Sequence, residues 1–108
     1  MERKIITTSD GSTTIQLVEW NEQYHSIHGA IQEAYHVFIK HGLSLFNQQR
    51  VHILEIGFGT GLNAIITKIE SDKSQLDIHY VGVEAYPVGE EEVAQLNYIE
   101  QLKAPYLF

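Results

Sequence analysis

Apolar residues follow two different periods along the chain, and these periods predict its elements. Near the N-terminus, the β-prone stretches 5–8 and 13–18 flank the turn signal Asp10-Gly11, so residues 1–20 are predicted to form a β-hairpin. Further along, an apolar stripe with i, i+3, i+4, i+7 spacing predicts a helix over residues 29–42. The stripe consists of Ile31, Ala34, Tyr35 and Phe38.

The second half of the chain alternates strand and helix patterns. Val51–Ile56 and Leu76–Val83 are short apolar runs typical of strands, and helical patterns follow them at about 61–70 and 90–102. This β-α-β-α order implies parallel strands with right-handed crossovers, so we expect a single α/β domain over residues 1–108. Four apolar residues of the last helix are expected to face inward: Val93, Leu96, Ile99 and Leu102.

Composition narrows the class of protein. The 108 residues are 44% hydrophobic and 19% charged, as in ordinary globular proteins. The lack of cysteine excludes disulfides, thiolate zinc sites and a cysteine nucleophile, and the six scattered histidines form no ligand pattern, so no metal is expected. A net charge of -7 is mildly unfavourable for a nucleic-acid partner without excluding one. No membrane span or signal peptide is recognisable, which predicts a cytoplasmic protein.

The stretch from Glu55 to Asn63, EIGFGTGLN, joins a predicted strand to a predicted helix, as the loop of a nucleotide-type cofactor site must. Glycines allow a sharp turn and let a cofactor lie against the backbone. The free N–H groups at the start of the following helix point into the same crevice. Phe58 adds no flexibility, and we expect its ring to pack beneath the loop. The candidate cofactor-binding residues here are Glu55, Gly57, Phe58, Gly59, Thr60, Gly61 and Asn63.

A second acidic strand end supports this interpretation. Glu84 follows Gly61 by 23 residues, and a carboxylate there can accept hydrogen bonds from both hydroxyls of a ribose. The alternative is that Glu84 is merely solvated. The spacing G-x-G-x-G lacks the last glycine position of the dinucleotide pattern, and Glu55 would lie badly beside a pyrophosphate. The loop instead resembles motif I of class I methyltransferases, which bind S-adenosylmethionine; an oxidoreductase that binds NAD is the weaker alternative.

With these residues, the chain resembles one family, the methyltransferase domain of the tRNA 5-methylaminomethyl-2-thiouridine biosynthesis bifunctional proteins. The resemblance rests on Leu54–Asn63, on Glu84–Pro87, and on the upstream pieces Tyr24–Ser26, Gly29–Ala30 and Glu33–Phe38. It implies a Rossmann-like fold and S-adenosylmethionine as the cofactor. It also implies that Glu55 lies near the methionine end, that Glu84 holds the ribose with Ala85 beside it, and that His25 lies near the pocket, with a solvated loop as the equal alternative for His25.

The reaction that the resemblance implies is methyl transfer to an aminomethyl nitrogen of the tRNA wobble uridine. The family's proton acceptor lies in an Asp-containing motif after the fourth strand, and no residue here corresponds to it. No catalytic residue is therefore assigned, and enzyme activity stays open. We expect an incomplete methyltransferase fold after the hairpin, with residues 51–108 as its cofactor-binding half. Its exposed edge at 51–56 would pair with another copy or with a missing C-terminal part. The alternative is a catalytically silent S-adenosylmethionine-binding or interaction fragment that requires a partner chain.

Overall fold

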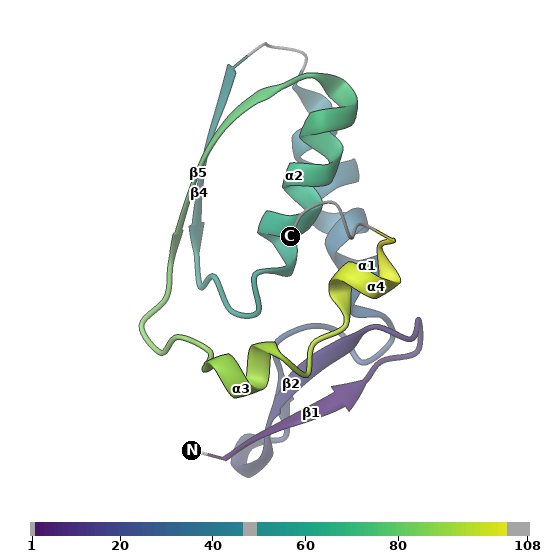
Figure 1. Cartoon of the computed structure of the whole chain (residues 1–108), viewed down its shortest axis with the longest axis vertical. Coiled ribbons are helices and arrows are strands. Elements are labelled where there is room, and N and C mark those ends of the chain that lie inside the picture. Colours follow the sequence, from purple (N-terminus) through teal and green to yellow (C-terminus); the bar gives the residue numbers. More distant parts are fainter. Residues whose placement is uncertain (1, 47–49, 104–108) are drawn as a thin grey trace. The chain divides into compact units, whose positions relative to one another are not determined.

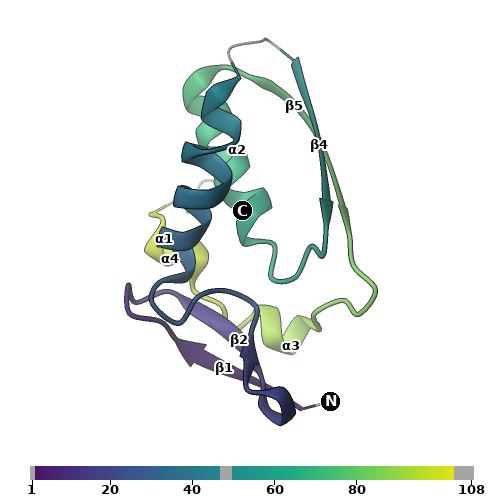
Figure 2. The same ribbon diagram turned by 180° about the vertical axis from the view of Figure 1, so that it is seen from behind.

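The computed structural model describes residues 2–46 and 50–103. It divides into two compact units, the first formed by Met1–Glu33 with Val88–Phe108 and the second by Ala34–Pro87. Each unit contains both helices and strands (Figures 1 and 2), which confirms the predicted mixed α/β class. Within the described residues, no helix is long and apolar enough to cross a membrane.

The first unit contains a three-stranded antiparallel sheet. Strands β1 (Arg3–Thr7) and β2 (Thr13–Leu17) pair across a tight turn, with Ile5 opposite Ile15. The side chain of Ile15 is fully buried. A third strand, β3 (Glu22–Gln23), pairs with the end of β2. The sequence did not predict β3, because two polar residues carry no recognisable period.

The turn of this hairpin caps helix α1 (Ala30–Ala34). The side-chain oxygens of Thr8, Ser12 and Asp10 accept hydrogen bonds from the backbone N–H groups of residues 30, 31 and 32, at 3.2, 3.3 and 3.0 Å. These are N–H groups that have no partner inside the helix. Burial raises the pKa of Asp10, but hydrogen bonds from Ser12 and Gln32 outweigh it and leave this pKa below its ordinary value.

The helix predicted over residues 29–42 changes its winding midway. After α1 it continues as a π-helical stretch, Tyr35–Lys40, with more residues per turn than an α-helix. The apolar stripe therefore shifts: Ala34 is buried as predicted, but Ile39 is buried in place of Phe38, which is 48% exposed.

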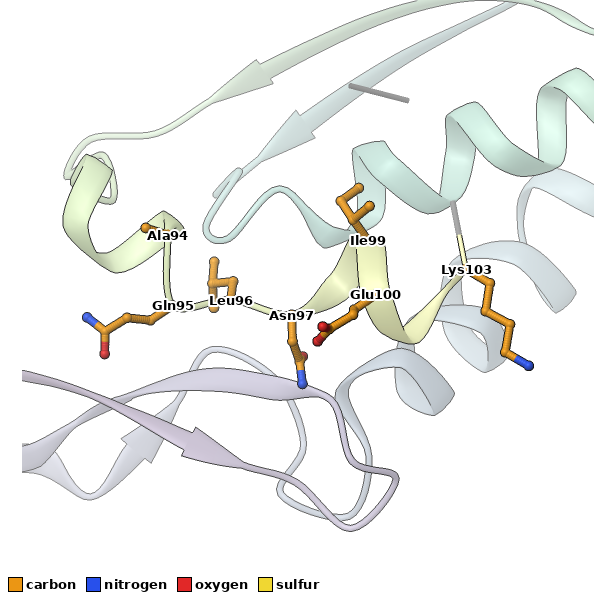
Figure 3. Close-up of a pocket in the computed structure, with 7 residues that line it drawn as sticks. All are labelled: Ala94, Gln95, Leu96, Asn97, Ile99, Glu100 and Lys103. Carbon is orange, nitrogen blue, oxygen red and sulfur yellow. The ribbon is translucent and has the colours of Figure 1, made fainter. Parts of the chain in front are cut away.

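Two short helices replace the single helix predicted over residues 90–102, so this prediction is wrong. They are α3 (Glu90–Val93) and α4 (Tyr98–Gln101). Asn97 separates them: its Oδ1 accepts hydrogen bonds from the backbone N–H and the hydroxyl of Thr13 at 2.9 and 3.0 Å, and its Nδ2 donates to the Gly11 carbonyl. Figure 3 shows Asn97 pointing away from Ile99.

The break also changes the face that is buried. Tyr98 becomes the buried residue of this segment, while Val93 is 51% exposed. The other three residues predicted to face inward, Leu96, Ile99 and Leu102, are half-buried. Within the acidic start of α3, Glu92 accepts a hydrogen bond from the Gly89 N–H and pairs with Arg3 at 3.0 Å.

The second unit is a β-α-β arrangement. Strands β4 (Arg50–Ile56) and β5 (Asp77–Val83) pair in parallel, which confirms the predicted direction, and α2 (Leu62–Ser74) connects them. Helix α2 runs alongside the two strands in both views of the chain (Figures 1 and 2). It buries Leu62, Ile66 and Ile69, and Ile65 is half-buried.

Candidate functional site

The glycine loop, residues 57–61, lies between the end of β4 and the start of α2. Gly57, Gly59 and Gly61 have φ angles of 82°, 57° and 82°. Residues with a Cβ rarely adopt this left-handed conformation, so the three glycines account for the sharp turn between strand and helix. Thr60 is buried within the loop.

The end of β5 anchors the glycine loop. The backbone N–H groups of Gly57 and Phe58 both donate to the carbonyl of Val83, at 2.8 and 3.1 Å. The ring of Phe58 packs against Gly61, where a Cβ would lie 3.2 Å from its Cε1 atom, as the sequence predicts for this ring. It also lies over Gly82, where a Cβ would overlap the ring. Sequence reasoning missed Gly82, although a glycine inside a strand indicates close approach of another group.

Glu84 joins the glycine loop to the segment after β5. Its Oε1 accepts a hydrogen bond from the Gly59 N–H at 2.8 Å, and its Oε2 accepts one from the Tyr86 N–H at 3.2 Å. The alternative in which Glu84 is merely solvated is therefore wrong. Ala85 lies between these two contacts and is exposed.

Glu55, near the end of β4, is held by two uncharged donors. Asn63 Nδ2 donates to its Oε2 at 2.6 Å, and the Tyr80 hydroxyl donates to its Oε1 at 2.6 Å. Burial raises the pKa of Tyr80, and the hydrogen bond to Glu55 and the charge of Glu55 raise it further. Sequence reasoning missed Tyr80. Period-2 alternation places it on the same face of β5 as Gly82, which lies opposite Glu55 in the parallel register.

Two acidic groups thus lie at the ends of neighbouring parallel strands, on either side of a loop rich in backbone N–H groups. Such an arrangement suits a ligand with hydroxyl and amine donors and disfavours one with a diphosphate, which the carboxylates would repel. Among the described residues, no group of three or more histidine, cysteine or acidic side chains could hold a metal ion.

Two features of the first unit, His25 and a hollow beside α4, lie outside this arrangement of the second unit. The candidate His25 belongs to that unit, where its Nδ1 lies 3.9 Å from Glu33 and its ring meets Tyr98 edge-on. A hollow is lined by residues of α4 and of the segment before it (Figure 3), and one of them, Asn97, is held by hydrogen bonds to the hairpin. Neither feature forms a cluster of chemically reactive groups. The residues that line the hollow are Ala94, Gln95, Leu96, Asn97, Ile99, Glu100 and Lys103.

Comparison with known proteins agrees with the motif-based resemblance. No family model matches the chain. The tRNA 5-methylaminomethyl-2-thiouridine biosynthesis bifunctional protein MnmC of Leptospira interrogans is 35% identical over 86 residues, which is 71% of this chain and 13% of that protein. MnmC of Burkholderia mallei is 35% identical over 95 residues, 82% of this chain and 14% of that protein.

A solved structure is similar as well. MNMC2 from Aquifex aeolicus matches with a TM-score of 0.74 and 27% identity, over 82% of this chain and 31% of that chain. This chain therefore spans only a small part of its relatives, between 13% and 14% of the two MnmC proteins. The similarity extends over most of this chain in both comparisons. The chain is therefore a relative of the MnmC proteins and corresponds to a segment of them.

Proposed function

We propose that this chain is the cofactor-binding half of an S-adenosylmethionine-dependent methyltransferase with a Rossmann-like class I fold. The β4–α2–β5 arrangement would be the first strand–helix–strand unit of that fold, preceded by the N-terminal hairpin, and residues 1–108 would form one domain. The cofactor would be held by Glu55, Gly57, Phe58, Gly59, Thr60, Gly61, Asn63, Glu84 and Ala85.

One observation carries the proposal. The hydrogen bond from the Gly59 N–H to Glu84 brings a carboxylate from the end of β5 to the glycine loop, 25 residues away in the sequence. A nucleoside cofactor needs both parts, because the loop admits the ligand close to the backbone and the carboxylate accepts the ribose hydroxyls. Glu84 is already oriented by two N–H groups, so little side-chain freedom remains to be lost on binding.

The charge of the site favours S-adenosylmethionine over NAD. With its sulfonium, ammonium and carboxylate groups, S-adenosylmethionine has a net positive charge, whereas the diphosphate of NAD outweighs its cationic nicotinamide ring and leaves a net negative charge. Glu55 and Glu84 attract the first ligand and repel the second. Bound at this site, S-adenosylmethionine supplies an activated methyl donor, and the residues of this chain bind and orient it.

The proposed substrate is an aminomethyl group on the wobble uridine of tRNA. It is supported by the name of the MnmC relatives, which places them in the biosynthesis of a 5-methylaminomethyl nucleoside of tRNA. The acidic net charge of -7 means that a tRNA contact in this part would have to use a local basic patch.

A second function is favoured by the exposed apolar face of the β4–β5 sheet. Leu54 and Ile56 of β4 and Val81 and Val83 of β5 are between 44% and 76% exposed on one face. Parallel sheets are normally covered on both faces. We therefore keep the alternative of a catalytically silent S-adenosylmethionine-binding or interaction fragment that works only with a partner chain.

Calorimetric titration with S-adenosylmethionine, S-adenosylhomocysteine and NAD tests the proposal. Glu84→Ala should weaken binding of the first two ligands by at least about tenfold, because both ribose hydroxyls lose their acceptor. Glu91→Ala, which removes an exposed glutamate of α3, is the matched control and should leave binding unchanged. Tighter binding of NAD, or equal binding by parent and Glu84→Ala, would overturn the proposal.

A further inference from the structure

Three elements of the second unit place side chains around one carboxylate. Glu55 comes from β4, Tyr80 from β5 and Asn63 from the first turn of α2. Each oxygen of Glu55 accepts one hydrogen bond of 2.6 Å, from the Asn63 amide on one side and the Tyr80 hydroxyl on the other. Because both donors are uncharged, they fix the direction of the carboxylate while leaving its negative charge available to a ligand.

Asn63 also presents an acceptor that no residue described by the structure satisfies. Its Oδ1 is buried and has no hydrogen-bond partner among the described residues. Because Nδ2 is committed to Glu55, the amide cannot turn this oxygen away without breaking that bond. A buried acceptor without a donor is unfavourable, and a ligand that brings a donor relieves the penalty. An ammonium group has three donors and no acceptor, so it can satisfy Asn63 Oδ1 and Glu55 together.

We propose that Tyr80 is a positioning residue that, by holding Glu55 beside Asn63, forms the acceptor pair for the ammonium group of the methionine moiety. This role rests on the proposed function. Gly82, the residue of β5 opposite Glu55, has no side chain, so Tyr80 is the donor that β5 offers on that face. The raised pKa of Tyr80 keeps its hydroxyl protonated, and therefore donating, well above neutral pH.

The test compares two ligands that differ only at the amino-acid end. S-adenosylhomocysteine carries the ammonium and carboxylate groups of the amino acid, and 5′-methylthioadenosine has the same nucleoside and thioether but lacks both groups. Tyr80→Phe should weaken binding of S-adenosylhomocysteine about three- to tenfold and leave binding of 5′-methylthioadenosine unchanged. Tyr35→Phe is the matched control, because it removes another tyrosine–glutamate hydrogen bond of the same unit, to Glu70 at 3.1 Å. It should change neither affinity.

A double-mutant cycle separates positioning from a general effect on folding. In a Glu55→Gln background, Tyr80→Phe should weaken S-adenosylhomocysteine much less than in the parent, because Tyr80 acts through Glu55. If Tyr80→Phe does not fold, Asn63→Ala must show the same loss for S-adenosylhomocysteine alone. Equal losses for both ligands, or no loss for S-adenosylhomocysteine, would overturn the role of Tyr80. Failure of the folded parent to bind either ligand would instead overturn the proposed function, and this role with it.

Discussion

Whether Gly82→Ala raises or lowers the free energy of unfolding depends on a single contact, the one between Gly82 and the ring of Phe58. Replacing a glycine inside a strand by alanine ordinarily stabilises a protein by about 0.5–1 kcal/mol, because alanine loses less conformational freedom on folding. Here the new Cβ would overlap the Phe58 ring and lie 3.0 Å from two further ring atoms, Cε2 and Cγ. The ring or β5 must move, and such overpacking costs about 1–3 kcal/mol. We therefore expect Gly82→Ala to lower the free energy of unfolding by about 1–2 kcal/mol.

Removal of the Phe58 ring should reverse the effect of Gly82→Ala on stability. In a Phe58→Ala background, the same substitution at Gly82 should stabilise the chain by about 0.5–1 kcal/mol, since the overlap is gone. The coupling between the two sites would then be about 2 kcal/mol. Urea unfolding of the four proteins, followed by circular dichroism, measures it. Equal stabilisation by Gly82→Ala in both backgrounds would refute the close packing of Phe58 on β5.

Three further predictions concern other parts of the chain. Asp10→Asn should lower the free energy of unfolding by about 1 kcal/mol at pH 7, because an amide nitrogen replaces one of the two carboxylate oxygens that accept hydrogen bonds from Ser12 and Gln32. Because the pKa of Asp10 is lowered on folding, this stabilisation is present above the unfolded pKa and is lost as the pH falls through the lower pKa of the folded state. The difference in urea midpoints between the two proteins should therefore shrink as the pH falls below about 4, and a difference that does not shrink contradicts the assignment. Ultraviolet titration should show Tyr80 ionising above its ordinary pH range, and at a lower pH in Glu55→Gln than in the parent. The stability that its hydrogen bond contributes is present below about pH 10 and is lost as the pH rises through the raised pKa. Identical titration curves for the parent and Glu55→Gln would be the contrary result. The chain should self-associate in sedimentation experiments, and the Leu54→Lys variant should associate less than the parent. A monomeric parent would argue against association through β4 or its exposed face.

The local elements of the second unit could be predicted because each has its own signal. The runs that became β4 and β5 are apolar and short, the glycines mark the turn between them, and α2 carries an apolar face. The distance in sequence from the glycine loop to Glu84 was enough to expect the carboxylate near the loop. The hydrogen bond to Gly59 required the structure.

The features that the sequence did not reveal depend on register or on distant partners. Tyr80 reaches Glu55 only in the parallel register that places Gly82 opposite Glu55. The break between α3 and α4 depends on Asn97 binding Thr13, a residue 84 positions away, so no local period could show it. The π-helical stretch likewise moved the buried position from Phe38 to Ile39, although the composition of the helix is ordinary.

The central claim is that the glycine loop and Glu84 together bind S-adenosylmethionine, and NMR titration of the ¹⁵N-labelled chain with S-adenosylhomocysteine tests it most directly. The amide resonances of Gly57, Gly59 and Gly61 should shift on binding, as should that of Tyr86, whose N–H is bound by Glu84. The amides of β1, in the other unit, serve as the internal reference and should stay in place. Shifts confined to the first unit, or a folded chain whose glycine-loop resonances do not respond to saturating ligand, would contradict the claim.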